Sequence, residues 1–388
     1  MAVQSIPNSD SSHEVPTGPI EVRPGCWLVG RRNPATLLQC NTYLRTFDGG
    51  GPPVHVCIDP GSRFDFATIE QNVKTLIGDL GEIHSFSLNH QDPDVVGNSL
   101  FLCEANPNIS AVVTEDVWRL VQHLNFKPRR IHFANATRSR LMTIGHQSRW
   151  QLVPTPFCHF RGAIAFYDPE LRTLFSGDLF GGLNRIGLVH AVAEETDWPG
   201  IAQFHQIYMP TREIVRYAVR QIRAIDPPVE IIAPQHGHII TGDLVPLFLE
   251  CMYDLPVGHD MLAIELDESY LTGYREVLAR VLALADVILG RDEVLHRLGA
   301  REPDDGLRRF IRVTTNEIVL EREGYTAMAE VLERLSRSEP SGVVNLLKSE
   351  LLRGCTDLAL PIPPVGIGIE GDWAPESIGS DGISLRPT

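Results

Sequence analysis

The chain has 388 residues, of which 43% are hydrophobic and 21% charged, and it carries a formal net charge of −15 at pH 7. This length exceeds what one hydrophobic core usually organises, so we expect more than one domain. The acidic balance argues against nucleic acid or an anionic membrane as a main partner, because phosphate-rich surfaces are bound by clustered Lys and Arg. No apolar run approaches the ~20 residues that a membrane-spanning helix needs.

The N-terminus is polar and has no basic region followed by an apolar one, so we expect residues 1–19 to be a disordered leader and no secretory signal. The seven cysteines are scattered and include no Cys-x-x-Cys pair, which excludes a rubredoxin-like or zinc-ribbon module. Four of them fall in apolar runs and are predicted to be small buried hydrophobic residues: Cys26, Cys40, Cys57 and Cys103. A cytoplasmic location, where thiols stay reduced, fits this pattern.

Residues 20–250 alternate short apolar runs with amphipathic patterns and Gly/Pro turns. The runs predicted to be strands are Trp27–Gly30, His55–Ile58, Ser85–Leu88, Ala111–Val113 and Ile164–Tyr167. The segments with apolar residues at helical spacing are Phe66–Ile77, Glu115–Leu124 and Thr211–Ile225. Strands and helices mixed in this order predict an α/β sandwich of two sheets covered by helices.

Six residues of metal-binding types follow strand-like runs in this region: His90, Asp92, Asp94, His159, Asp178 and His236. Three imidazoles and three carboxylates are too many for one zinc ion, and they suit two metals that share a bridging carboxylate. The Asp92-Pro93-Asp94 sequence alone would also make a good turn. The remaining histidines are assigned to the surface or the core, and three of them are candidates to support the ligands through hydrogen bonds: His190, His205 and His238.

This pattern resembles the metallo-β-lactamase superfamily, whose motif is His-x-His-x-Asp-His followed by His, Asp and His at wide spacing. The resemblance covers roughly Asn41 to Glu250, including the Asn41–Leu44, Cys57–Gly61 and Ser176–Gly182 segments. It implies the αββα sandwich of that superfamily.

Two departures from the motif are informative. Asp92 stands where the hydrolases carry their second His, and Val95 stands where they carry the last one. A carboxylate at position 92 is typical of the di-iron branch, which comprises the flavodiiron proteins and the oxygen-binding di-iron proteins (ODP), although these usually carry Glu there. The Phe204–Pro210 segment also resembles the stretch that follows the bridging Asp in flavodiiron proteins.

Iron and manganese prefer carboxylate-rich ligand sets, whereas zinc is well served by imidazole and thiolate. We therefore expect two iron ions, with zinc or manganese as alternatives. His90 and Asp92, at strand-like spacing, are expected to hold one metal together with His159. The second metal would be held by Asp94 and His236, with Asp178 between the two.

Val95 cannot coordinate a metal, so the second metal would keep an open position at which a small molecule can bind. Two other interpretations are a degenerate site with one metal or none, and replacement of the missing ligand by His190 or His238. If the position is open, Val95→His should tighten metal binding and weaken an O2 adduct.

After Glu250 the chain becomes rich in helical patterns, and residues 251–354 are expected to form a helical module. The predicted helices are Glu268–Leu289, Asp292–Leu298, Leu307–Thr314, Tyr325–Leu335 and Val343–Leu352. This module is expected to serve either dimerisation or signalling output. The Pro- and Gly-rich tail, residues 355–388, is expected to be extended or disordered.

The sequence supports three hypotheses for function. The first is a di-iron protein that binds O2 or NO, as a sensor or oxygen-binding protein, with a signalling partner and a homodimeric assembly. The second is an O2 or NO reductase fed by an external flavoprotein, because no phosphate-cradling loop of a flavodoxin domain follows Glu250. The third is a zinc hydrolase of thioesters or lactones, which Asp92 disfavours because its charge makes metal-bound water less acidic.

Overall fold

The computed structural model describes residues 4–5, 15–262, 269–299, 306–314 and 317–366. The chain forms two compact units, one of Met1–Pro34 with Leu38–Ile264 and one of Ala35–Leu37 with Glu265–Thr388. The first unit thus continues past the expected boundary at Glu250, and it contains all six predicted ligands. Among the described residues, no helix combines the length and apolar character that crossing a bilayer requires.

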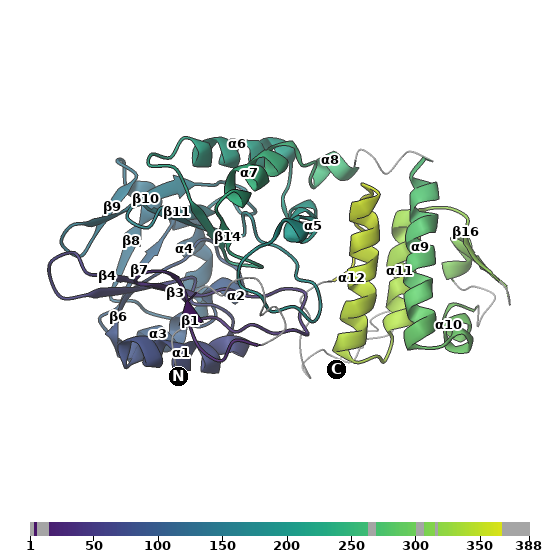
Figure 1. Ribbon diagram of the computed structural model, residues 1–388, viewed down its shortest axis with the longest axis horizontal. Coiled ribbons are helices and arrows are strands. Elements are labelled where there is room, and N and C mark those ends of the chain that lie inside the picture. The colour runs from purple at the N-terminus through teal and green to yellow at the C-terminus, as the bar shows by residue number, and fades with distance from the viewer. Residues whose placement is uncertain (1–3, 6–14, 263–268, 300–305, 315–316, 367–388) are drawn as a thin grey trace, which may run out of the picture. The chain divides into compact units, whose positions relative to one another are not determined.

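The first sheet of the α/β unit has eight strands that follow one another in chain order (Figure 1). Neighbouring strands are antiparallel from β2 to β5 and parallel from β5 to β8. The strands are β1 (Gln4–Ser5), β2 (Ile20–Arg23), β3 (Cys26–Leu28), β4 (Tyr43–Phe47), β5 (Val54–Ile58), β6 (Ile83–Ser87), β7 (Ser110–Val113) and β8 (Arg130–Phe133).

The second sheet has six strands in the order β14-β13-β12-β11-β10-β9. They are β9 (Leu141–Ile144), β10 (Ser148–Pro154), β11 (Ile164–Asp168), β12 (Thr173–Gly177), β13 (Ile231–Pro234) and β14 (Ile240–Thr241). Strand β11 is antiparallel to both β10 and β12, and β12 is parallel to β13. Strands β10, β12 and β13 therefore run in one direction and end at the same edge of the sheet.

Helices cover the outer faces of the sandwich, with α1 to α4 on the first sheet and α6 on the second. The described helices of this unit are α1 (Phe66–Ile77), α2 (Pro93–Val96), α3 (Ser99–Ala105), α4 (Glu115–Val121), α5 (Trp198–Tyr208), α6 (Arg212–Arg223), α7 (Leu244–Asp254) and α8 (His259–Leu262). Buried residues of α1 to α4, such as Val73 and Val117, form one apolar cluster with Phe86 of the first sheet. Helix α6 contacts β10 of the second sheet. The predicted αββα sandwich is therefore confirmed.

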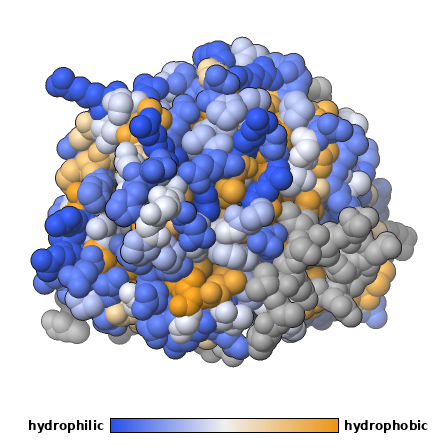
Figure 2. All heavy atoms as spheres, turned by 60° about the vertical axis from the view of Figure 1, so that its left-hand side comes forward, coloured by the Kyte–Doolittle hydropathy of each residue, from blue (hydrophilic) through white to orange (hydrophobic). Residues whose placement is uncertain are grey.

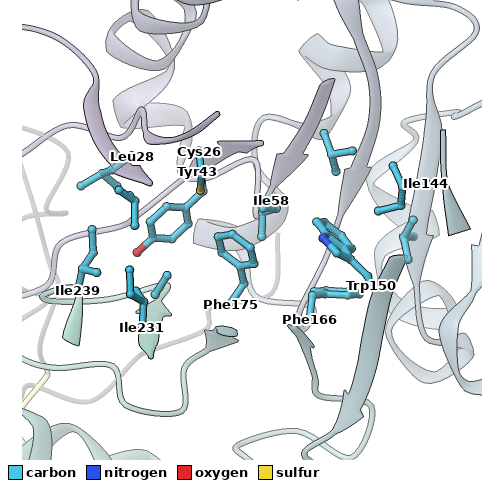
Figure 3. Close-up of a cluster of buried hydrophobic side chains, with 14 of the residues drawn as sticks. Cys26, Leu28, Tyr43, Ile58, Ile144, Trp150, Phe166, Phe175, Ile231 and Ile239 are labelled. Atoms are coloured by element: carbon cyan, nitrogen blue, oxygen red, sulfur yellow. The ribbon is translucent and has the colours of Figure 1, made fainter. Parts of the chain in front are cut away.

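A second apolar cluster fills the space between the two sheets (Figure 3). Tyr43 of the first sheet packs on Phe175 of the second with ring centroids 5.5 Å apart, and Trp150 is fully buried against Phe166. Burial of side chains of this size stabilises the fold by roughly 1.5–3 kcal/mol each. By contrast, the face drawn in Figure 2 is largely hydrophilic, with small separate apolar areas.

One buried ion pair also joins the two sheets. Arg45 Nε of β4 lies 2.7 Å from Asp168 Oδ2 at the end of β11, and the two side chains are only 6% and 0% exposed. Asp168 Oδ1 accepts hydrogen bonds from the backbone N–H groups of Glu170 and Leu171. Glu170, whose side chain is 49% exposed, also contacts the Arg45 guanidinium at 3.0 Å.

Asp168→Asn should lower the free energy of unfolding by about 3–5 kcal/mol, because it leaves the Arg45 charge buried without its main partner. Glu170→Gln is the control, and we expect less than about 1 kcal/mol for this exposed pair. Urea denaturation of both variants measures the difference. Equal small losses would show that the ion pair does not hold the sheets together.

The second unit is mainly helical and has its own apolar core. Its elements are α9 (Ser269–Ile288), α10 (Arg291–Leu298), β15 (Ile311–Val313), β16 (Ile318–Leu320), α11 (Gly324–Ser336) and α12 (Ser341–Asp357). The prediction of a helix over Leu307–Thr314 is wrong. A 3-10 turn at Gly306–Arg309 leads instead into β15. This segment is a strand because Ile311–Val313 pairs with Ile318–Leu320 of β16.

The expected termini are described only in part. Residues 1–3, 6–14 and 367–388 lie outside the described residues, whereas Gln4–Ser5 form β1, which pairs with β2. Helix α12 runs to Asp357, beyond its expected end at Gly354, so the first residues of the expected tail are helical.

Candidate metal centre

The structure brings all six predicted ligands to one edge of the sandwich. His90 follows β6 of the first sheet, whereas His159, Asp178 and His236 follow β10, β12 and β13 of the second. The strands of both sheets thus deliver their ligands to the same place, as expected for a site built on strand ends.

Asp178 lies at the middle of this cluster. Its Oδ1 is 3.5 Å from His90 Nε2 and 3.5 Å from His236 Nε2, and its Oδ2 is 3.2 Å from His159 Nε2. The side chain is only 3% exposed. The Asp178 carboxylate therefore contacts His90 and His159, which are expected to hold one metal, and His236, which is expected to hold the other. This is the placement of a bridging ligand.

The first half of the cluster consists of His90, Asp92 and His159 around Asp178. Asp92 Oδ2 is 3.0 Å from His159 Nε2 and 3.7 Å from His90 Nε2. The expected strand-like spacing of His90 and Asp92 is not observed, because β6 ends at Ser87 and Asp92 is the N-cap of α2. The bend that follows β6 brings the two side chains together instead.

The second half contains Asp94 and His236, with Asp94 Oδ2 3.4 Å from His236 Nε2. It also contains Cys40, whose Sγ lies 3.8 Å from Asp94 Oδ2. The ligand-type atoms of these three residues all lie within 4.8 Å of one another. The prediction that Cys40 is a buried hydrophobic residue is thus wrong, since the side chain is half-buried beside two ligand-type groups. Its only sequence signal is its place directly before the Asn41–Leu44 segment.

Val95 does not face the centre. Its side chain is fully buried in the apolar cluster beneath the first sheet, together with Ile69 and Leu88. Successive residues of a helix point ~100° apart, so α2 can turn Asp94 to the centre while Val95 enters the core. The Val95 side chain thus points away from the ligand-type groups, and the expectation that Val95→His restores a ligand stays a prediction.

His190 and His238 do not replace the missing ligand either. Their rings stack with centroids 4.1 Å apart, and His190 Nε2 lies 2.9 Å from Asp197 Oδ2. Burial lowers the pKa of His238 to about 3. The Arg32 guanidinium contacts His238, and that of Arg185 contacts Asp197. These positive charges disfavour a cation among His190, Asp197 and His238, which form a group separate from the predicted ligands.

Residues of the segments that resemble the superfamily hold the ligand loops in place. Asp59 Oδ1 accepts a hydrogen bond from the N–H of Asn89, next to His90. Asn41 Nδ2 and the Tyr43 hydroxyl both donate to the carbonyl of Pro234, two residues before His236. These bonds fix the backbone from which two imidazoles project.

The loop after β12 is held equally closely. Gly177 has φ +62°, and a Cβ at this position would lie 2.8 Å from the Asn89 side chain, so a larger residue would displace the His90 loop. His205 Nε2 accepts a hydrogen bond from the N–H of Phe180, and its Nδ1 donates to Ile201. His205 therefore supports the Asp178 loop and is one of the three candidates for this role in the sequence.

The carboxylates and imidazoles of the cluster shift one another's pKa values because they lie close together. Burial alone would raise the pKa of Asp178, but the neighbouring imidazoles of His90, His159 and His236 hold it well below its usual range. Burial would likewise lower the pKa of His159, but its hydrogen bonds with Asp178 and Asp92 raise it to about 10. Opposite charges are thus concentrated in a small volume.

The residues present fit a pair of metal ions. His90 Nε2 and Asp178 Oδ1 are buried polar atoms without a hydrogen-bond partner. His236 donates its Nδ1–H to the Gln39 carbonyl at 2.8 Å, which turns its Nε2 lone pair toward Asp94 and Asp178. This second hydrogen bond is typical of metal-binding histidines. Asp92 and Asp94 remain 33% and 30% exposed, so the cluster is open to solvent on one side.

The fold and this site define a metallo-β-lactamase-like domain of the di-iron branch. The family model described as "ODP family beta lactamase" matches residues 38–237, and the chain belongs to this family. The family and branch inferred from the sequence are therefore confirmed.

Individual relatives agree with this assignment. The chain is 27% identical over 241 residues to the type A flavoprotein fprA of Rhodobacter capsulatus, covering 58% of this chain and 53% of that protein. The chain thus spans about half the length of this relative.

Two solved structures share the fold. The apo state of the chemotaxis sensor ODP from T. denticola is 23% identical, with a TM-score of 0.51 over 63% of this chain and 96% of that one. The flavodiiron protein from Giardia intestinalis is 16% identical, with a TM-score of 0.52 over 60% of this chain and 58% of that one.

Asp178→Ala should remove most of the bound metal, because it deletes a carboxylate that contacts both halves of the cluster. We expect metal content to fall from about two ions per chain to less than about one. His123→Ala, at an exposed histidine, is the matched control and should keep full content. Elemental analysis measures the metal, and circular dichroism shows that both variants are folded. Full metal content in Asp178→Ala would contradict a bridging role.

Proposed function

We propose that this protein binds O2 or NO at a di-iron centre and acts as a sensor or an oxygen-binding protein. The observation that carries this proposal is the placement of the Asp178 carboxylate between three imidazoles of one edge. His90, Asp92 and His159 would hold one iron, and Asp94 and His236 the other. When bound, reduced iron would supply the electron density with which O2 or NO binds to a metal.

The composition of the cluster supports iron. Three carboxylates offset much of the charge of two cations, and oxygen-rich sets favour iron or manganese over zinc. The exposed sides of Asp92 and Asp94 give a small molecule access to the centre. The buried sides of His90 and Asp178 keep bulk water from its interior.

The second candidate is an O2 or NO reductase that takes electrons from a separate flavoprotein. It is favoured by the similarity to the type A flavoprotein fprA, of which this chain matches about half. The sensor role draws support from the T. denticola protein, whose fold is shared and which is itself described as a chemotaxis sensor. The helical unit, with its own core, would then provide signalling output or a dimer contact.

Protein purified without oxygen and without added metal should contain about two irons per chain, since the two halves of the cluster share one bridging carboxylate. Inductively coupled plasma mass spectrometry measures iron, zinc and manganese together. Stoichiometric zinc with no iron would overturn the proposal and favour the hydrolysis of a thioester or lactone.

A single dose of O2 mixed anaerobically with the reduced protein distinguishes the sensor from the reductase. A sensor should give one long-lived change in visible absorption per centre, because no electron donor is present to turn the site over. With a flavoprotein donor and NADH added, a reductase would consume O2 continuously, which an oxygen electrode detects. Steady consumption at several turnovers per minute would argue against the sensor role.

A further inference from the structure

The second half of the cluster lacks one ligand of the superfamily motif. Val95 points into the apolar core, which leaves Asp94, His236 and the shared Asp178 from the predicted set. The Sγ atom of Cys40 lies beside Asp94 and His236, 3.8 Å from Asp94 Oδ2.

The position of Cys40 is fixed by the same segment that orients His236. The backbones of Cys40 and His236 form an antiparallel β-bridge, and the N–H of Asn41 donates to the Gln235 carbonyl at 2.6 Å. The Gln39 carbonyl accepts the Nδ1–H of His236. The thiol and the imidazole are therefore held side by side by backbone contacts, independently of any interaction between the side chains.

We propose that Cys40 is a thiolate ligand of the second metal, in place of the imidazole that the motif carries at position 95. This inference rests on the proposed dimetal centre. Cys40 would complete a set of one thiolate, one imidazole and two carboxylates around that metal, with Asp178 shared.

The distances within the set suit a single ion. Ligand atoms at roughly 2.0–2.3 Å from a tetrahedral ion lie about 3.3–3.8 Å from one another. The observed separations are 3.4 Å between Asp94 and His236, 3.5 Å between His236 and Asp178, and 3.8 Å between Cys40 and Asp94. The ligand-type atoms of Cys40, Asp94 and His236 all lie within 4.8 Å of one another, so one ion can contact these three donors.

The thiolate would also change the properties of the centre. Asp92, Asp94, Asp178 and a Cys40 thiolate each carry one negative charge, so together they balance the charge of two divalent ions. A soft thiolate favours iron or zinc over manganese at the second position. The ligand sets of the two metals would then differ, because the first metal is surrounded by oxygen and nitrogen atoms only.

A different role for the thiol is a weak hydrogen bond to Asp94, without any contact to metal. Cys158 provides a comparison within the chain, since it directly precedes the ligand His159. It is buried, burial raises its pKa to about 12, and it is not part of the ligand-type cluster. Proximity in sequence to a ligand thus does not suffice to place a thiol at the centre.

Cobalt(II) serves as the probe metal, because a cobalt–thiolate bond gives an intense near-ultraviolet charge-transfer band that oxygen and nitrogen ligands do not give. Metal-free full-length protein is titrated with Co2+ under nitrogen, and bound metal is measured by elemental analysis. We expect the band in the wild type as the second ion binds. It should be lost in Cys40→Ser, with a dissociation constant for that ion about 10–100-fold higher. Cys251→Ser, a half-buried thiol on α7, is the control and should keep the band.

The outcomes separate this inference from the proposed function. If the wild type binds one or two Co2+ ions without the band, or if Cys40→Ser keeps the band, Cys40 is not a ligand and the dimetal proposal stands on its other residues. If the wild type binds no stoichiometric Co2+, the proposed centre itself fails, and this inference fails with it.

A measurement on the wild type alone guards against a variant that does not fold. Iodoacetamide labelling of the Cys40 peptide is followed by mass spectrometry in metal-free and Co2+-loaded protein. We expect bound metal to slow the labelling of Cys40 at least about 10-fold, because a coordinated sulfur is a poor nucleophile. Labelling of Cys251 should not change. Equal rates for Cys40 in the two states would overturn the proposal.

Discussion

The buried carboxylate of Asp178 imposes the arrangement of the whole edge. A charged group that is only 3% exposed is costly unless opposite charges or hydrogen-bond donors surround it. Three imidazoles meet this need, and they come from loops after strands of both sheets. The sandwich must therefore hold its two sheets in a fixed relation, and the aromatic contacts between them and the Arg45–Asp168 ion pair do so. The contacts that stabilise the packing of the two sheets thus also hold the imidazoles in place around Asp178.

The first half of the cluster and the second differ in how they are built. His90, Asp92 and His159 gather where a bend after β6 meets the end of β10, and they use only imidazole and carboxylate. The second half is formed where the Cys40 segment lies along the His236 loop. Backbone pairing brings Cys40 and His236 together, whereas Asp94 comes from the same short segment as His90 and Asp92.

The sequence predicted much of the fold, since the strand that precedes each ligand and the helix at Phe66–Ile77 follow from local hydrophobic periodicity. It predicted the wrong element at Leu307–Thr314, where pairing with a later strand outweighs local pattern. The position of Cys40 beside Asp94 and His236 could not be predicted for a similar reason, because His236 lies 196 residues away and the contact depends on a β-bridge. The direction of Val95 required knowing that α2 begins at Pro93 and turns that residue into the core.

The segment Gln39–Asn41 should tolerate substitutions better than insertions or deletions. Its carbonyl at 39 orients His236, its backbone at 40 pairs with the same residue, and the Asn41 side chain binds the carbonyl of Pro234. Three successive residues are thus matched in register with two positions of the other loop, Pro234 and His236. A substitution here alters one contact, whereas a single inserted or deleted residue shifts all of them at once. We therefore expect natural variation in this segment to exchange side chains while its length is conserved.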